Sequence, residues 1–120
     1  MAFRPEINAI TFHVVDMTRS LAFYRALGFE LVYGGPTAAF SSLSIGPDFV
    51  NLQRVDDAPT PAWGRVIFHV ESPDEVHQRC VESGFDPMMA PSNAPWGERY
   101  FHVRDPDGHE LSFARRLRGH

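Results

Sequence analysis

The sequence predicts an α+β domain made of two βαβββ modules in tandem. The first observation is an internal repeat: sliding the chain by 56 residues superposes 10–30 on 66–86 without a gap. The five identities among these 21 positions are Phe12-His13-Val14 on Phe68-His69-Val70 and Gly28-Phe29 on Gly84-Phe85. The second observation is that apolar periodicity reads strand, helix, strand, strand, strand in both copies.

The first copy is predicted over about residues 7–55. It begins with a strand at 7–15, rich in branched and aromatic residues. Asp16 is a helix N-cap candidate, the apolar positions after it recur at spacings of three and four, and Gly28 is a stop signal. Alternating segments then predict strands over 30–33, 38–45 and 49–55.

A polar, proline-containing linker is predicted over about 56–63, and the second copy over about 64–115. Its first strand is expected at 65–71. Ser72-Pro73-Asp74-Glu75 reads as a capping box with proline at the first helical position, and Gly84 ends that helix. The remaining strands are expected at 86–90, 99–104 and 110–114, with a long loop over 91–97 and a hairpin turn at 105–108.

Composition narrows the class of protein. The 120 residues suit one domain, and the net charge of −4 has no basic stripe beyond Arg115-Arg116-Leu117-Arg118, which argues against nucleic acid. The chain has no apolar run of ~18 residues, so no membrane span is expected. The start of the sequence lacks a signal-peptide pattern. Cys80 is the single cysteine, so no internal disulfide is expected and a cytoplasmic location is favoured.

Several motifs resemble the vicinal-oxygen-chelate superfamily of glyoxalases, bleomycin-resistance proteins and extradiol dioxygenases. They are Asp16, Arg19-Ser20, Phe23-Tyr24, Leu27-Gly28-Phe29 and the Asp105-Pro106-Asp107-Gly108 turn before the last strand. This resemblance implies that the mixed sheets of the two modules curl around a cup. It also implies a homodimer, because such modules often pair or exchange arms between chains.

The second copy is most similar to the bleomycin-resistance branch. Pro95-Trp96-Gly97, followed by Tyr100-Phe101 and then Arg104-Asp105-Pro106, matches the pattern of those proteins. The Asp-Pro-Asp-Gly turn is shared with catalytic members, so it indicates the fold rather than an activity.

Enzymes of this superfamily hold a divalent metal through the first and last strands of each module. Counted from the fixed motifs, the corresponding positions here are Ala9, Asn51, Arg65 and Ser112. Alanine has no donor atom, arginine stays protonated, and asparagine and serine are weak neutral ligands. A shift of register by two, to Thr11, Ile67, Glu110 and Gln53, restores no ligand set either. The sequence therefore predicts no metal at the standard positions and leans against an enzyme.

A non-standard metal site remains an alternative. Strand alternation places His13 and His69 on the same faces as Ala9 and Arg65, and the repeat relates the two histidines. With Gln53 or Glu110 they could bind Fe, Mn, Ni or Zn. The other interpretation is that both histidines are polar wall residues of the cup, in a ligand-binding role.

The expected ligand is a small flat aromatic molecule carrying an anionic group. Trp96, in a Pro/Gly loop, and Tyr100 are the stacking candidates, while Phe101 and Val103 are expected in the core. Arg65 is expected to pair with the anion, because it and the nearby histidines should make the cup basic. The full candidate set is His13, Asn51, Gln53, Arg65, His69, Trp96, Tyr100 and His102.

Three functions follow from the sequence. The first is a metal-independent protein that binds or sequesters a small molecule and confers resistance to an antibiotic or toxin. The second is a divalent-metal-dependent enzyme of the glyoxalase or dioxygenase type with non-standard ligands. The third is a metal-free enzyme with a histidine general base, or a regulatory module.

Overall fold

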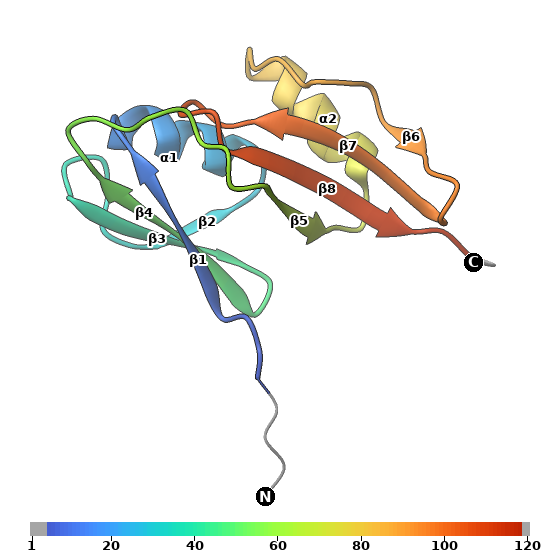
Figure 1. Ribbon diagram of the computed structural model, residues 1–120, viewed down its shortest axis with the longest axis horizontal. Coiled ribbons are helices and arrows are strands. Elements are labelled where there is room, and N and C mark those ends of the chain that lie inside the picture. The colour runs from blue at the N-terminus through green and yellow to red at the C-terminus, as the bar shows by residue number, and fades with distance from the viewer. Residues whose placement is uncertain (1–4, 119–120) are drawn as a thin grey trace, which may run out of the picture.

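The computed structural model describes residues 5–118 and shows two four-stranded mixed sheets, each with one helix (Figure 1). The first module contains β1 (Ala9–Val14), α1 (Met17–Ala26), β2 (Glu30–Tyr33), β3 (Phe40–Ile45) and β4 (Asp48–Arg54). The second contains β5 (Arg65–His69), α2 (Pro73–Glu82), β6 (Ser92–Asn93), β7 (Glu98–Arg104) and β8 (Glu110–Arg116). The predicted α+β fold of two βαβββ units is confirmed.

The strand order is β1-β4-β3-β2 in the first sheet and β5-β8-β7-β6 in the second. In each sheet the first and last strands of the module run parallel, β1 with β4 and β5 with β8, and the other pairs are antiparallel. The repeat seen in the sequence therefore appears again in the topology. The residues that connect β4 to β5 form neither helix nor strand.

Both helices begin where side-chain caps were predicted. The Asp16 carboxylate accepts the backbone N–H of Arg19, and the Ser72 hydroxyl accepts that of Glu75. These bonds satisfy N–H groups that the first turn of a helix leaves unpaired. Gly28, with φ of +103°, follows the end of α1 in the left-handed backbone region that glycine tolerates.

One predicted strand is misplaced. Residues 86–90 do not form a strand; the short strand β6 lies at Ser92–Asn93, inside the predicted loop. Pro87 and Pro91 lack the N–H group that a ladder requires, and the backbone of this stretch makes one bond to β7, from Met88 N–H to the His102 carbonyl. The apolar run predicted a strand, but its prolines prevent the pairing.

The core lies between the two sheets and the helices. Figure 1 shows both helices in the upper part of the view, with most of the strands below them. Aromatic rings join the modules: Phe29 packs edge-to-face on Phe68, and Phe23 on Phe85. The shared core leaves one face of each sheet open.

Within the described residues, no helix is long and apolar enough to cross a bilayer.

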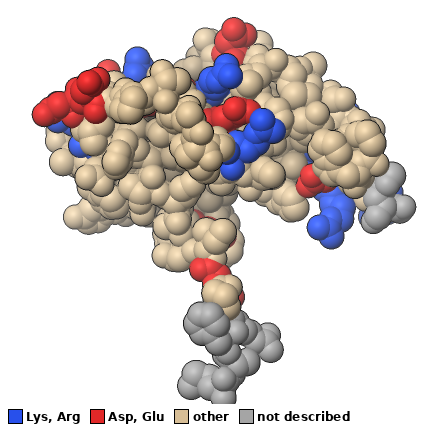
Figure 2. Space-filling view, in the orientation of Figure 1, with Lys and Arg blue, Asp and Glu red and all other residues tan. Residues whose placement is uncertain are grey.

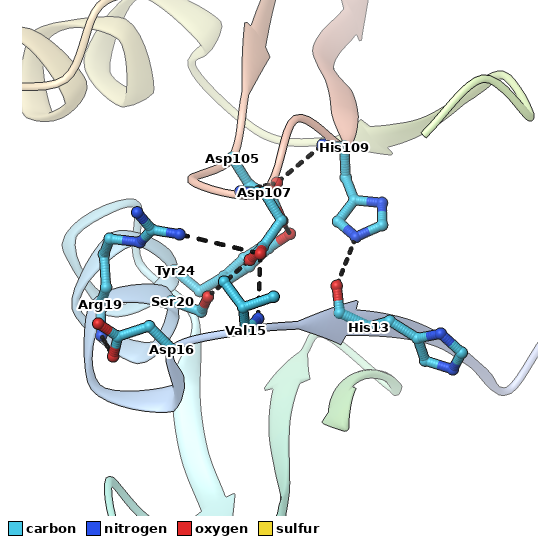
Figure 3. A network of polar contacts seen from close by, with 9 residues as sticks. All are labelled: His13, Val15, Asp16, Arg19, Ser20, Tyr24, Asp105, Asp107 and His109. Carbon is cyan, nitrogen blue, oxygen red and sulfur yellow. Dashed lines mark hydrogen bonds and ion pairs between the residues drawn. The ribbon is translucent and has the colours of Figure 1, made fainter. Parts of the chain in front are cut away.

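A polar network also joins the modules (Figure 3). The Asp107 carboxylate, in the β7–β8 turn, accepts the Val15 N–H and the Ser20 hydroxyl at the start of α1. The buried Tyr24 hydroxyl donates to Asp105 at 2.7 Å, and the His109 ring donates to the His13 carbonyl at 2.9 Å. The Asp-Pro-Asp-Gly turn therefore anchors the second module to the first.

Candidate functional site

The open face of the second sheet collects most of the charged and aromatic candidates. Alternation along β7 buries Phe101 and Val103 completely and turns Tyr100 and His102 to the open face, as predicted. A hollow of about 440 Å³ on this face is lined by Arg65, Ile67, Trp96, Glu98, Tyr100, His102 and Ser112. We call it the sheet-two pocket.

Three rings follow one another along this pocket. The Trp96 and Tyr100 centroids lie 5.8 Å apart with an interplanar angle of 32°, and Tyr100 and His102 are 5.1 Å apart at 54°. Trp96 is 67% exposed, which is unusual for so large an apolar side chain. This series, which we call the aromatic ladder, presents ring surface to solvent and not to the core.

Glu98 holds the outer end of the ladder in place. One of its carboxylate oxygens accepts the Trp96 indole N–H at 2.8 Å, and the other lies 3.1 Å from His69 Nε2. Both contacts lower the pKa of the Glu98 carboxyl, that of Trp96 most. Glu98 is not among the candidates selected from the sequence, although the alternation that selects Tyr100 and His102 also places residue 98 on the open face.

Arg65 joins the inner end of the ladder to β8. Its guanidinium contacts Glu110 Oε1 at 2.6 Å and His102 Nε2 at 3.0 Å. Because arginine only donates, Nε2 must accept, and the ring proton resides on Nδ1. That Nδ1 is buried and has no hydrogen-bond partner in residues 5–118.

Burial lowers the pKa of His102 below 6.5, the Arg65 charge lowers it further, and Glu110 opposes the shift. A base with a lowered folded-state pKa stabilises the fold above its unfolded pKa, and that contribution is lost as the pH falls through the folded value. We therefore expect unfolding free energy to decrease as the pH drops below 6.5. His102→Asn should weaken this dependence of the unfolding free energy on pH, as measured by urea unfolding at a series of pH values below 6.5. An unchanged slope in the variant would contradict this prediction.

The prediction that the ligand-binding face is basic is wrong. Glu98 and Glu110 lie among the candidate side chains, and Glu110 already neutralises Arg65. The pairing of Arg65 with Glu110 across β5 and β8 places the two side chains next to each other. Figure 2 likewise shows acidic and basic side chains intermixed on the face in view, without a basic stripe.

The remaining candidates lie elsewhere. Asn51 is on the open face of the first sheet, where it accepts from the Ser42 hydroxyl at 2.6 Å and donates to Thr11 at 3.3 Å. His13 and Gln53 pair as neighbours on the same sheet, and both are exposed. His69 contacts the ladder through Glu98. The structure thus brings Arg65, Trp96, Tyr100 and His102 into one pocket and leaves His13, Asn51 and Gln53 outside it.

The four standard ligand positions do not fit a divalent metal. Ala9 has no donor, the guanidinium of Arg65 is paired with Glu110, and the Asn51 amide is already bonded to Ser42 and Thr11. The Ser112 hydroxyl lines the sheet-two pocket as a neutral oxygen. In residues 5–118, no cluster of three or more His, Cys, Asp or Glu side chains is arranged to hold a metal.

The two repeat-related histidines line different hollows. His69 borders the cleft between β1 and β5, and His13 borders a pocket beneath the linker. The imidazole of His69 bonds Glu98, and Glu110, one of the two oxygen ligands considered beside Gln53, bonds Arg65. A metal held by both histidines would require a different arrangement of these groups.

Comparison with known proteins identifies the family. Residues 6–113 match the model of the Glyoxalase/Bleomycin resistance protein/Dioxygenase superfamily. A Metallothiol transferase FosB from Shouchella clausii (strain KSM-K16) is 29% identical over 116 residues, covering 88% of this chain and 76% of that protein.

Solved structures share the fold. A glyoxalase family protein from Bacillus anthracis superposes with a TM-score of 0.80 at 16% identity, covering 97% of this chain and 98% of the other. A bleomycin-binding protein complexed with bleomycin superposes with a TM-score of 0.73 at 22% identity, covering 93% of this chain and 98% of the other. The family match spans both modules, so the chain belongs to the Glyoxalase/Bleomycin resistance protein/Dioxygenase superfamily.

Proposed function

We propose that this protein binds a small planar aromatic molecule in the sheet-two pocket, without a metal. The observation that carries the proposal is the aromatic ladder: three adjacent rings on an open sheet face, with Trp96 held by Glu98. Exposed, preorganised rings favour stacking because little side-chain freedom is lost on binding. The family includes bleomycin-resistance proteins, which supports small-molecule binding as the coarse function.

The charges of the pocket modify the expected ligand. An anionic group would have to displace Glu110 from Arg65, where the contact is 2.6 Å. Glu98 adds a second carboxylate at the other end of the ladder. We therefore place stacking first and expect neutral or cationic aromatic ligands to bind more tightly than anionic ones.

A homodimer completes the proposal. Among residues 5–118, β1 pairs only with β4 and β5 only with β8, so each has an edge without a strand partner in that range. A cleft of about 610 Å³ lies between these strands, and Ile67 and Trp63 beside it are 57% and 54% exposed. Unpaired edges flanked by apolar side chains favour a partner chain. A second copy would also enclose the sheet-two pocket against another sheet face.

Sequestering a toxic compound in the cytoplasm is the biological role we infer. A bleomycin resistance determinant and a bleomycin-binding protein have the same fold, which supports resistance as the role. The cytoplasmic location rests on the lone Cys80 and stays a prediction.

A metal-dependent enzyme is the second candidate. The similarity to a metallothiol transferase favours it, and the donor set at residues 9, 51, 65 and 112 opposes it. His13 and His69 would be the ligands in that case.

Ligand binding after metal removal separates the two functions. The full-length protein is treated with a chelator, checked for metal by elemental mass spectrometry, and titrated calorimetrically with metal-free bleomycin, 9-aminoacridine, acridone and 2-naphthoate. We expect at least one neutral or cationic compound to bind with a Kd on the order of micromolar, the range of modest pocket ligands, and 2-naphthoate to bind more weakly.

Two outcomes would contradict the proposal. One is that none of the four compounds binds. The other is that binding disappears on chelation and returns with Mn²⁺ or Zn²⁺ in the wild type but not in the His13→Ala, His69→Ala double variant. That result would favour the enzyme.

A further inference from the structure

A second pocket lies beneath the linker, away from the aromatic ladder. It encloses about 410 Å³ between β1, the linker and the β7–β8 turn, and its main walls are Phe12, Pro59, Pro61, Trp63 and His109. It shares no residue with the sheet-two pocket. Its volume lies within the range of small-molecule sites.

The walls of this linker pocket are mostly aromatic or proline rings. The centroids of Phe12 and His109 are 4.6 Å apart, and those of Phe12 and Trp63 are 6.4 Å apart. Phe12 is 2% exposed and His109 7%, whereas Trp63 is 54% exposed. Two rings are therefore set into the core, and a third forms a solvent-facing wall. An apolar ring fits these surroundings better than a charged or sugar-like group.

His109 supplies a single unused polar atom. Its Nε2 lies 2.9 Å from the His13 carbonyl, which can only accept, so Nε2 carries the proton. In the neutral ring Nδ1 is then a lone-pair acceptor, and this buried atom has no partner within residues 5–118. In Figure 3 it points away from the carboxylates of the polar network.

The prolines of the linker supply no hydrogen-bond donor to Nδ1. Pro59 and Pro61 have no N–H to donate, and the linker has no regular secondary structure to hold it rigidly. A buried acceptor without a donor is unfavourable, and a donor from a bound water or ligand would satisfy it. Because Nδ1 is covered by the surrounding atoms, a ligand donor reaches it only if the stretch around Pro59 and Pro61 shifts.

From this arrangement we propose that the linker pocket is a second binding site, for an uncharged single-ring or two-ring aromatic molecule with an O–H or N–H donor, such as a phenol or an indole. The ring packs against Phe12 and Trp63, and the donor bonds His109 Nδ1. This site goes beyond the proposed function, because it uses none of the ladder residues.

The two tryptophans allow each pocket to be observed separately. In the full-length Trp96→Phe protein, the Trp63 indole N–H gives its own signal in ¹H–¹⁵N spectra. Phenol and anisole, which differ in the hydroxyl donor, are titrated against that signal. We expect phenol to shift it with an affinity about fivefold higher than that of anisole, the contribution of one hydrogen bond.

Two variants test the assigned contacts. His109→Phe should abolish the preference for phenol over anisole, whereas His77→Phe, at a histidine on α2 that does not line the linker pocket, should keep it. Because replacing His109 also removes its bond to the His13 carbonyl, Trp63→Ala provides a second test that leaves this bond intact. This exposed position should tolerate alanine and lose phenol binding, as measured by saturation transfer from the protein to phenol.

Equal affinities for phenol and anisole, or no response of Trp63 to either, would overturn the second site. The aromatic ladder is followed independently through Trp96 in the Trp63→Phe protein. A failure of one site is therefore distinguishable from a failure of the other.

Discussion

Replacing Asp105 with alanine is expected to lower the free energy of unfolding by about 3 kcal/mol or more, through loss of a buried hydrogen-bond network. Asp105 is 4% exposed. Its carboxylate accepts the Tyr24 hydroxyl at 2.7 Å and the backbone N–H groups of Asp107 and His109 at 3.0 and 2.8 Å. Alanine leaves these donors without an acceptor, and the turn that anchors the modules loses its internal support.

The pKa shifts of Asp105 and Tyr24 agree with a buried hydrogen bond between them. Burial raises the pKa of the Asp105 carboxyl, and the bond from Tyr24 opposes the rise. Burial and the neighbouring Asp105 raise the pKa of Tyr24 well above 10.0, so its hydroxyl stays protonated and donates. The interaction is therefore between a buried carboxyl group and a phenol that remains a donor at neutral pH.

Thermal and urea unfolding of Asp105→Ala, Tyr24→Phe and the double variant measure this coupling. The two single changes should be strongly non-additive, because the residues share one bond. Asp56→Ala is the control, since the side chain of Asp56 is 94% exposed and should contribute less than about 0.5 kcal/mol. A loss at Asp105 no larger than at Asp56 would show that the network does not hold the modules together.

Truncating Trp96 to alanine is expected to weaken binding of a planar ligand to the sheet-two pocket by at least about tenfold, the effect of removing a central stacking residue. The indole is exposed, so its removal should leave the unfolding free energy nearly unchanged. Calorimetric titration with whichever planar compound the wild type binds gives the affinity, and a melting curve checks the fold.

Two further variants make this test specific. Tyr33→Ala removes a 66% exposed aromatic side chain on β2 that lines no part of the sheet-two pocket, and it should leave the affinity unchanged. Glu98→Gln keeps an oxygen that can accept the Trp96 N–H, so it should reduce the ligand affinity less than Trp96→Ala does. If Tyr33→Ala weakened binding as much as Trp96→Ala, binding would not depend on the ladder.

Local features of the fold were predictable because short-range interactions determine them. Asp16 and Ser72 lie three residues before the N–H groups that they accept, so each cap is visible in a few residues of sequence. The same holds for strand faces, since alternation alone placed Tyr100 and His102 opposite Phe101 and Val103. The misplaced strand at 86–90 marks the limit, because whether a segment pairs depends on a neighbouring strand and on free N–H groups.

The sequence selected some of the residues that line the sheet-two pocket, but not its charge, and His13, Asn51 and Gln53 lie outside it. Arg65, Trp96, Tyr100 and His102 were all selected from the sequence, and they line one pocket. Glu98 was missed, and Glu110 was considered only as a metal ligand. Their partners lie 29 and 45 residues away along the chain, so only the lateral register of β5, β7 and β8 brings each carboxylate to its base.

The sequence alone determined the repeated unit, the helix boundaries and the faces of the residues in β1, β5 and β7, because all three depend on neighbours within a few positions. The tertiary structure decided which of those faces stay open, which charges cancel, and where the modules join. Asp107 and the Val15 N–H are separated by 92 positions, and the rings of Phe12, Trp63 and His109 meet only after the linker folds back over β1. Contacts of that range leave no local pattern, since they depend on how two completed modules pack.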